Sequence, residues 1–508
     1  MKRSVAILLA GIVLGSSIPF HAGCEPRSIL SYHGHPDRSG HFVVPALTWK
    51  RARSLRLDKG FHPDISGHVY AQPLYWHPPG PRPAMLLVAT EDDTVYAIDA
   101  ETGDEIWKRS LGTPVARASL GCGNIDPLGV TGTPVIDESA GAVYLDAAVD
   151  GASGPRHLIF ALSLKDGSSL PGWPVDVADA LERGHQEFVP RDQNQRGALT
   201  ILDGRLYVPF GAHGGDCGGY HGFVVSVSIR DSAIVRSWAT RARGGGIWAP
   251  GGISSDGTSL FVATGNTIDA AAWGDGEAVV RLDPELHRSG DKRDFFAPPD
   301  WQILDASDAD LGGTNPLPVD ILTESGKEAL ILALGKDGKA YLLDRNNLGG
   351  IGGSLAVETV AKPPIITAPV VYPSADGVYI AFQGSGANCP AKGKDSGLTV
   401  LQIRPRSRPM ISTAWCAPLQ GVGSPIVTTT DGHSNPIVWI SGAEGDNRLH
   451  GFRGDTGEPL FTGPPLELPG LRHFQTPIAT KERIYIAADG TVYAFRTQAA
   501  TSYRRRNR

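Results

Sequence analysis

The feature that most constrains this 508-residue chain is a β-unit that occurs eight times. The first copy spans residues 86–112 (LLVATEDDTVYAIDAETGDEIWKRSLG). It contains an apolar run, a polar turn, an alternating strand at 95–99, an Asp-x-x-Thr-Gly turn and a third strand that carries Trp107. Alternation of apolar and polar residues predicts one buried face for each strand. Such a small unit needs neighbours of its own kind to complete a core.

The other copies follow at the spacing of propeller blades. They begin at Val143, Leu206, Leu260, Leu330, Val378, Ile437 and Ile484. A short strand precedes each copy, often with a proline, as in AQPLY, TGTPVID, TAPVVY and QTPIAT. The pattern predicts an all-β protein, an eight-bladed β-propeller with four-stranded blades. The last unit lacks its third strand, so we expect 42–50 (FVVPALTWK) to close the ring on blade eight and remove the open edges.

Composition agrees with one large ring and narrows the range of partners. The 63 glycines and 39 prolines suit a turn-dense β structure, and no long helical periodicity appears. The net charge of −6, without a large block of either sign, does not favour nucleic acid as a partner. We therefore divide the chain into a signal peptide (1–23), an N-terminal linker (24–41), the propeller (42–497) and a basic, solvated tail (498–508).

The N-terminus predicts export. Lys2 and Arg3 precede an apolar run at 5–18, which small residues follow at 22–23, as in a secretory signal. The protein is then periplasmic or extracellular. Cys24 stands where a bacterial lipoprotein would be cleaved and lipidated, but His21 departs from the residue such sites carry. Simple export is the first interpretation, and lipidation at Cys24 is the alternative, in which case the protein would bind the membrane.

Four further cysteines remain for an oxidising compartment. Cys389 and Cys416 fall in one blade, so we expect them to pair. Cys122 and Cys217 would then join blades two and three, although three connectivities are possible from the sequence alone. The spacing of cysteines and histidines does not suggest zinc.

Several motifs resemble a known family. The repeat segments AIDAETGDEIW and YLLDRNNLGG resemble the blades of the eight-bladed quinoprotein dehydrogenases, which use pyrroloquinoline quinone (PQQ). The segments HVYAQPLY, CGNIDPLGVTGTPVID, DQNQRGAL and ATGN are similar to exported bacterial propellers related to those enzymes. The resemblance covers nearly the whole mature chain and implies the quinoprotein alcohol dehydrogenase-like fold.

The resemblance also implies site residues. Trp248, in GGGIW, matches the aromatic floor under the quinone, and Asn266, in ATGN, matches an amide ligand of calcium. Asp310 matches the catalytic base, and Lys336 matches the cation beside the quinone oxygens. Stacking would hold the planar cofactor, calcium would polarise its carbonyl, and a carboxylate would take the alcohol proton.

Each of these residues also has a structural interpretation. Trp248 could pack between blades, Asn266 could make a turn, Asp310 could accept hydrogen bonds from loop amides, and Lys336 could lie at a hairpin tip. The calcium-binding Glu of the family is replaced by Cys217, with Asp216 beside it. The paired adjacent cysteines that cover the cofactor are absent as well.

These departures favour an exported PQQ-repeat-like propeller that is a non-catalytic binding or scaffold protein, similar to the propeller lipoproteins of outer-membrane assembly. Its partner would be a protein or a small molecule at the propeller axis. The alternative is a periplasmic, PQQ- and calcium-dependent alcohol or sugar dehydrogenase with an altered site. In that case we expect weak, calcium-dependent quinone binding, which Cys217→Glu would strengthen if Cys217 were free of a disulfide bond.

Overall fold

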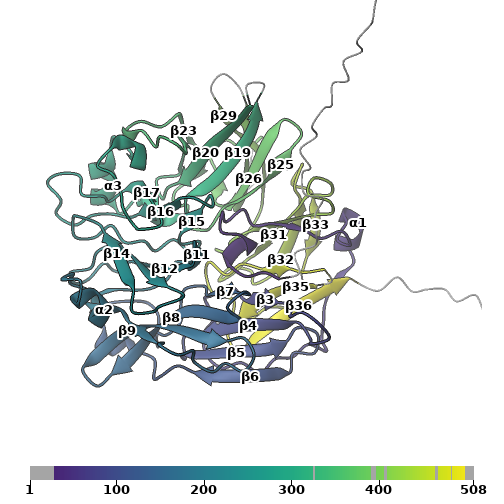
Figure 1. The fold of residues 1–508 in the computed structure, drawn as a ribbon. Coiled ribbons are helices and arrows are strands. Elements are labelled where there is room, and N and C mark those ends of the chain that lie inside the picture. The colour runs from purple at the N-terminus through teal and green to yellow at the C-terminus, as the bar shows by residue number, and fades with distance from the viewer. Residues whose placement is uncertain are drawn as a thin grey trace, which may run out of the picture.

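The computed structural model describes residues 28–323, 326–390, 396–405, 409–463, 467–481 and 483–497. Eight four-stranded antiparallel units follow one another around an axis, which confirms the predicted eight-bladed propeller. Figure 1 shows the first blade, with β4 and β5, lying beside the last, with β35 and β36. Apolar side chains of these two blades share one core cluster, so the ring is closed by packing.

The first four blades contain these strands, given from the axis outward. Blade one has β3 (Leu74–Trp76), β4 (Met85–Thr90), β5 (Thr94–Asp99) and β6 (Glu105–Ser110); blade two has β7 (Val135–Asp137), β8 (Ala142–Gly151), β9 (Gly154–Ser163) and β10 (Val175–Asp176). Blade three has β11 (Thr200–Leu202), β12 (Arg205–Phe210), β13 (Phe223–Ser228) and β14 (Val235–Ala239); blade four has β15 (Ser254–Ser255), β16 (Leu260–Thr264), β17 (Ala278–Leu282) and β18 (Phe295–Ala297), with β22 (Gly350–Ile351) added outside.

The last four blades repeat the plan. Blade five has β19 (Leu317–Thr323), β20 (Gly326–Leu334), β21 (Lys339–Asp344) and β23 (Ala356–Thr359); blade six has β25 (Val370–Ser374), β26 (Gly377–Gln383), β28 (Leu398–Arg404) and β29 (Met410–Ala417). Blade seven has β30 (Ile426–Thr429), β31 (Ile437–Ser441), β32 (Leu449–Arg453) and β33 (Pro459–Thr462); blade eight has β34 (Ile478–Ala479), β35 (Arg483–Ala488), β36 (Thr491–Thr497) and β2 (Leu55–Leu57).

The remaining elements are short. A two-stranded ribbon pairs β24 (Ala361–Lys362) with β27 (Ser385–Gly386), and the α-helices are α1 (Trp49–Ala52), α2 (Val177–Glu182) and α3 (Trp301–Ser307). The 3₁₀ turns are η1 (Tyr32–Gly34), η2 (Arg117–Ser119), η3 (Pro190–Asp192), η4 (Lys292–Asp294) and η5 (Leu311–Gly313). Among the described residues, no helix has the length and apolar character needed to cross a membrane.

The middle strands differ from the predicted alternation. All six residues of β4 and of β12 are buried, so both faces of these strands are covered. Blades pack face to face around the ring, and exposed residues lie mainly on the outermost strands, such as β6, and at strand ends, such as the start of β20. The expected single buried face is therefore wrong for β4 and β12, which are buried on both faces.

Tryptophans on outer strands lock neighbouring blades together. Trp107 donates its indole N–H to the carbonyl of Leu164 in blade two (3.2 Å). Its ring lies over Gly167, where a Cβ would come within 2.6 Å of the ring. Trp415 and Gly457 repeat the arrangement between blades six and seven, so the glycine turns admit the rings.

The ring is closed by a strand other than the predicted one. Blade eight receives β2, where Leu55 pairs with Thr497 and Leu57 with Phe495. The segment 42–50 instead contributes to β1 (His41–Val43), which pairs in parallel with β30 of blade seven, and to α1. The prediction that 42–50 closes blade eight was wrong, because a short strand (LRL) thirteen residues after Phe42 fills that edge.

The segment 28–44 lies along the axis of the ring. Its backbone makes hydrogen bonds to the inner strands of blades one, two, four, six and seven; the partners are Tyr75, Ile136, Ser255, Val371 and Val427. The fully buried Arg38 donates to the carbonyls of Gly251 (3.0 Å), Tyr32 (3.1 Å) and Leu199 (2.8 Å). The axial segment thus joins blades far apart in sequence.

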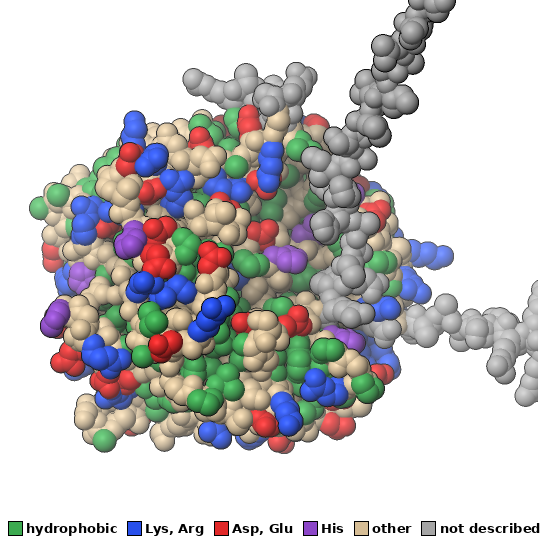
Figure 2. Space-filling model, in the orientation of Figure 1, with side chains coloured by type: hydrophobic (Ala, Val, Ile, Leu, Met, Phe, Trp, Pro, Cys, Tyr) green, Lys and Arg blue, Asp and Glu red, His purple; other side chains and the backbone are tan. Residues whose placement is uncertain are grey.

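The predicted signal peptide (1–23), Cys24 and the basic tail (498–508) lie outside the described residues. The visible surface in Figure 2 mixes acidic and basic side chains, in keeping with a net charge of −6 and no block of one sign.

Candidate functional site

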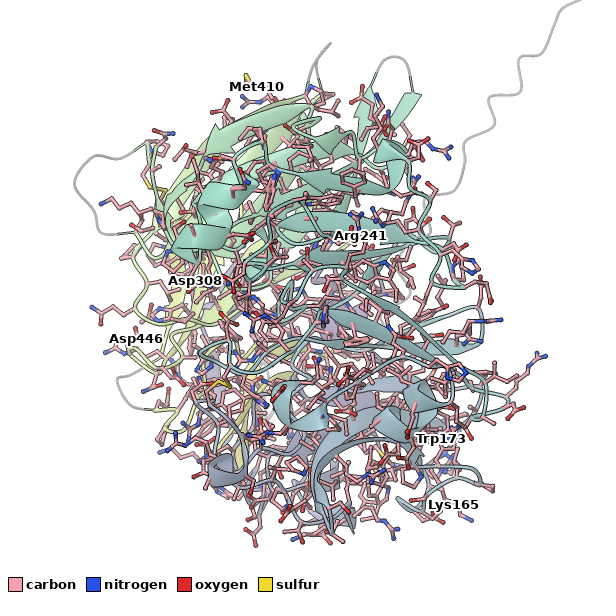
Figure 3. The ribbon with its side chains drawn as sticks, turned by 90° about the vertical axis from the view of Figure 1, so that its left-hand side faces the viewer. Lys165, Trp173, Arg241, Asp308, Met410 and Asp446 are labelled. Carbon is pink, nitrogen blue, oxygen red and sulfur yellow. A yellow bond between two sulfur atoms is a disulfide. The ribbon has the colours of Figure 1, made fainter. Side chains whose placement is uncertain are left out.

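The residues singled out by sequence gather at one end of the ring, which we call the mouth. Two kinds of loop form it: the loop between the second and third strands of each blade, and the connector that leads from one blade to the next inner strand. Asn266 and Lys336 lie in loops of the first kind, and Trp248 and Asp310 lie in connectors. Figure 3 shows Asp308, in the connector that carries Asp310, and Asp446, in the loop between the second and third strands of blade seven, toward the same side of the molecule.

Asp310 is the centre of this group. Its carboxylate is almost fully buried, and Oδ1 accepts a hydrogen bond from the backbone N–H of Asn266 (2.9 Å). Oδ2 accepts from the indole N–H of Trp248 (3.1 Å) and lies 2.7 Å from Nζ of Lys336. The structure therefore brings together all four residues, from blades three, four and five.

Lys336 fills the space next to the tryptophan ring. Its Nζ lies 5.0 Å from the centroid of Trp248, a cation–π arrangement, and 2.8 Å from Oδ1 of Asp308. Burial disfavours the charge on Lys336, but the carboxylates of Asp310 and Asp308 outweigh burial and raise the pKa of the lysine. A stable cation thus covers this aromatic face and neutralises the buried carboxylate.

Asp216 lies apart from this cluster. Its Oδ1 accepts the phenol hydroxyl of Tyr220 (3.0 Å), and no hydrogen bond or ion pair joins it to Asp310 or Asn266 in the described structure. Burial raises the pKa of Asp216, and the charges of Asp310 and Asp308 add to that effect. Its role as a metal ligand stays a prediction.

Both expected disulfides are present, Cys122–Cys217 and Cys389–Cys416. Cys217 is therefore not free, and the condition under which Cys217→Glu would create a calcium ligand is not met. The Cys122–Cys217 bond ties the connector between blades one and two to the loop of blade three that carries Asp216.

Two acidic residues of the site escaped the sequence analysis. Glu277 is fully buried; Oε2 accepts the N–H of Leu311 (2.6 Å), and Oε1 has no partner. Burial, and then the nearby Asp310 charge, raise the pKa of Glu277 well above its ordinary value. Asp305 of α3 accepts both the N–H (2.8 Å) and the hydroxyl (2.5 Å) of Thr267. The available signal was a charged residue directly before a buried strand, Glu277 before AVVRL.

The residues at the mouth do not fit the calcium site that the resemblance implies. Among the described residues, no group of three or more His, Cys, Asp or Glu side chains is arranged to hold a metal ion. Calcium takes six to eight oxygen ligands, whereas Asp310 already accepts from two N–H groups and faces the Lys336 ammonium. The Lys336 ammonium, a cation that the chain itself supplies, lies beside the Asp310 carboxylate.

A small cavity lies deeper on the axis, between the mouth and the axial segment. Its volume is about 10 Å³, and Tyr32, Tyr70, Thr131, Arg196, His473 and Phe474 are among its lining residues. Tyr32 belongs to the axial segment, so that segment forms part of the cavity wall. Its lining mixes aromatic rings with polar groups, and the cavity has about the size of one water molecule.

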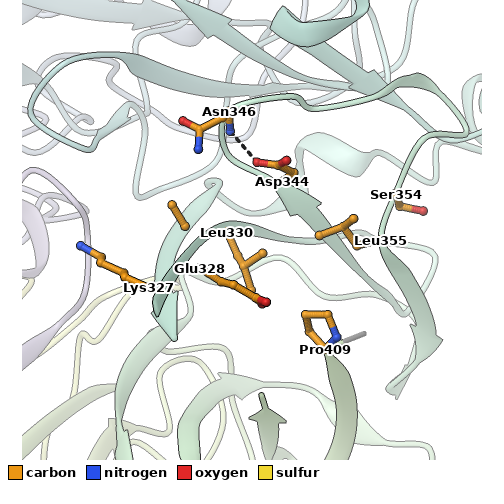
Figure 4. A pocket seen from close by; sticks show the side chains of 9 residues that line it. Lys327, Glu328, Leu330, Asp344, Asn346, Ser354, Leu355 and Pro409 are labelled. Atoms are coloured by element: carbon orange, nitrogen blue, oxygen red, sulfur yellow. Dashed lines mark hydrogen bonds between the residues drawn. The ribbon is translucent and has the colours of Figure 1, made fainter. Parts of the chain in front are cut away.

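A larger groove of about 550 Å³ lies elsewhere, at the end of blade five opposite the mouth (Figure 4). Two of its charged side chains have local partners: Lys327 pairs with Asp320 (2.8 Å), and Asp344 accepts the backbone N–H of Asn346 (2.8 Å). The lining residues belong to strand ends opposite the mouth, so this groove is separate from the cluster around Asp310.

Comparison with solved structures places the fold. Over 93% of the chain, the structure is similar to quinohemoprotein alcohol dehydrogenase ADHIIG from Pseudomonas putida HK5 (TM-score 0.66, 14% identity, 80% of that chain). It is also similar to the quinohemoprotein alcohol dehydrogenase from Comamonas testosteroni (TM-score 0.62, 16% identity, 93% of this chain and 81% of that chain). The chain has the fold of the quinoprotein dehydrogenases.

Two further structures mark the breadth of this fold. A europium-containing methanol dehydrogenase matches with a TM-score of 0.62 and 13% identity, over 93% of this chain and 98% of that chain. BamB from Moraxella catarrhalis matches with a TM-score of 0.50 and 12% identity, over 87% of this chain and all of that chain. No protein-family model and no curated protein sequence matches the chain. The comparisons confirm the expected fold class, and fold alone does not carry an activity.

Proposed function

We propose that this chain is an exported, non-catalytic binding protein whose ligand docks at the mouth of a quinoprotein-type propeller. The observation that carries the proposal is the position of Lys336, 5.0 Å over the ring of Trp248 and 2.7 Å from Asp310. The lysine takes the face on which a planar cofactor would stack, and it pairs with the carboxylate that would act as base.

Two further features support this proposal. The quinoprotein dehydrogenases that the sequence resembles have a calcium-binding Glu where this chain has Cys217. Cys217 is bonded to Cys122 in a disulfide. The two disulfides also favour an oxidising compartment, in agreement with the signal-like N-terminus.

The second candidate is a PQQ- and calcium-dependent dehydrogenase with an altered site. The convergence of Trp248, Asn266, Asp310 and Lys336 favours it, since these are the positions that the resemblance implies. The two candidates differ in one measurable property, the retention of quinone.

The test compares the mature wild-type chain with Lys336→Ala. Each protein is incubated with PQQ and calcium, freed of excess cofactor by gel filtration, and assayed by visible absorbance and by dye-linked oxidation of ethanol. We expect no stoichiometric quinone and no oxidation with the wild type. Lys336→Ala should retain more quinone than the wild type, because the Trp248 face becomes free.

Lys339→Ala is the matched control, because it removes a nearby lysine that pairs with Asp300 and Asp337 and has no contact with Trp248. It should behave as the wild type does. Stoichiometric quinone with alcohol oxidation in the wild type would overturn the non-catalytic proposal and establish the second candidate.

A further inference from the structure

Two carboxyl groups are buried at the tip of the hairpin that joins β4 to β5 in blade one. Glu91 and Asp93 are both fully buried. Glu91 accepts the N–H of Gly129 (2.7 Å), and the hydroxyl of Thr131 lies beside its carboxyl group. Neither oxygen of Asp93 has a hydrogen-bond partner in the described structure. Because buried polar groups nearly always have a partner, Asp93 is an exception that needs a cause.

The surroundings of Asp93 are acidic. Burial raises the pKa of Asp93 from 3.8 to about 9, and the charges of Glu91, Asp146 and Asp92 add to that effect. Asp146 is hydrogen-bonded to His157 (2.7 Å), so that histidine is taken up by another carboxyl. A buried charge without a partner is costly. The native packing therefore holds Asp93 as a neutral carboxylic acid.

The other ionisable neighbours face Glu91. Arg196, in the connector to blade three, favours the ionised form of Glu91, whereas Asp92 opposes it. Tyr70, in the connector that enters blade one, lies near enough for the Glu91 charge to oppose its own ionisation. No ion pair joins Glu91 to Arg196 in the part of the chain that the structure describes. Burial is the largest influence and raises the pKa of Glu91 from 4.5 to about 7.

The acidic tip holds two connectors of the mouth. The N–H of Glu91 donates to the carbonyl of His68 (2.9 Å), in the connector that enters blade one. The N–H of Val130, in the connector to blade two, donates to the carbonyl of Thr90 (3.3 Å). A Cβ at Gly129 would come within 2.4 Å of the carbonyl oxygen of Glu91, so the second connector lies directly on the tip.

Asp93 packs against the same connector, since a Cβ at Gly129 would come within 2.7 Å of its Oδ1. The two connectors also carry Tyr70 and Thr131, which line the axial cavity. We propose that the hairpin tip of blade one is a proton-dependent latch, which holds both connectors while Asp93 and Glu91 are neutral and releases them when the two carboxyls ionise. Release opens the axial cavity toward the mouth. The inference rests on the proposed function, because it adds a regulation to the end at which the ligand docks.

Protons close this latch. In the open state both carboxyls meet water and return to their ordinary pKa values, which are lower than those of the closed state. Each group therefore stabilises the closed state below its ordinary pKa, and this stabilisation is lost as pH rises through the raised value. Between about pH 7 and about pH 9, Asp93 is neutral in the closed state and ionised in the open state. Opening then releases about one proton, so the opening constant should rise about tenfold for each pH unit.

The test measures hydrogen exchange of the mature chain, without ligand, by mass spectrometry over the same pH interval. Each rate is divided by the rate of an unstructured peptide at that pH. The reporters are residues 90–94 and 128–131, and β20 of blade five reports on unfolding of the ring. Asp93→Asn removes the charge, and asparagine suits the positive φ of 51° at this position. Asp92→Asn is the matched control, because this half-buried neighbour has a partner in the Ser66 hydroxyl (2.9 Å).

We expect the opening of both reporters to rise about a hundredfold between about pH 7 and about pH 9 in the wild type and in Asp92→Asn. In Asp93→Asn it should stay level within about threefold, because no other carboxyl of the tip changes its charge there. At every pH the reporters should exchange faster than β20, since the latch opens while the ring stays folded.

A level opening in the wild type, or an equal rise in Asp93→Asn, would overturn the latch. Exchange of the reporters at the same rate as β20 would also overturn it, because the tip would then open only with the whole ring. None of these outcomes changes the quinone experiment. Conversely, quinone-dependent oxidation would overturn the proposed function without altering the pH dependence of exchange, so the two failures are distinguishable.

Discussion

At the scale of single residues, Glu91 shows how the packed mouth changes the chemistry of a side chain. Its Oε2 accepts the N–H of Gly129 (2.7 Å), and Oε1 is buried without a partner. Burial raises the pKa of Glu91 from 4.5 to about 7. Because the pKa in the folded state is above the unfolded value, its contribution to stability is full below about pH 4.5 and is lost as pH rises through about 7.

We therefore predict that Glu91→Gln stabilises the protein at pH 8 and not at pH 4.5. A glutamine keeps an acceptor for Gly129 and carries no charge, so the gain should approach about 1–3 kcal/mol at pH 8. The urea midpoints of the two proteins should coincide at pH 4.5 and separate as pH rises. Glu101→Gln, at an exposed position of the same blade, is the control. Parallel midpoint curves for wild type and Glu91→Gln would contradict the prediction.

At the scale of elements, β2 is the strand that completes blade eight. Leu55 is 1% exposed and belongs to the core cluster shared by the first and last blades. We predict that Leu55→Ala destabilises the protein by about 2–4 kcal/mol, the range of large-to-small core changes. The neighbouring Arg56 is exposed, so Arg56→Ala should change stability by less than about 0.5 kcal/mol.

Hydrogen exchange tests the same assignment directly. Loosening β2 should speed exchange in β36, its partner, and leave β30 of blade seven unchanged. Faster exchange in β30 with an unaffected β36 would show that the chain closes elsewhere.

The elements also show what a sequence can reveal. The second strands and the Asp-x-x-Thr-Gly turn were predictable because their signals are local; Asp99 indeed accepts the N–H groups of Glu101 (2.7 Å) and Thr102 (3.0 Å). The closing strand was not predictable, because LRL is a weak pattern whose pairing with Thr497 depends on tertiary contact. The four-residue cluster at Asp310 was located through the resemblance, whereas Glu277 was missed, since its burial follows only from packing around the ring.

At the scale of the whole molecule, the axial segment makes the two ends of the propeller different. Ser28 contacts Glu138, which follows the far end of β7, so the described chain begins at the end opposite the mouth. The segment then bonds to inner strands of most blades and leaves the axis beside blade seven. Residues 28–44 thus enter the axis at one end of the ring, and the candidate ligand groups lie at the other.

This arrangement predicts that one buried side chain stabilises the whole ring. Arg38→Met should leave the carbonyls of Gly251 and Leu199 without a donor, at a cost of about 1–3 kcal/mol for each buried group. Because those carbonyls belong to different blades, the main calorimetric transition should move to lower temperature as a whole. Arg51→Met, at an exposed position of α1, should leave it in place. An Arg38→Met protein that melts with the wild type would mean that the axial segment occupies the ring without stabilising it.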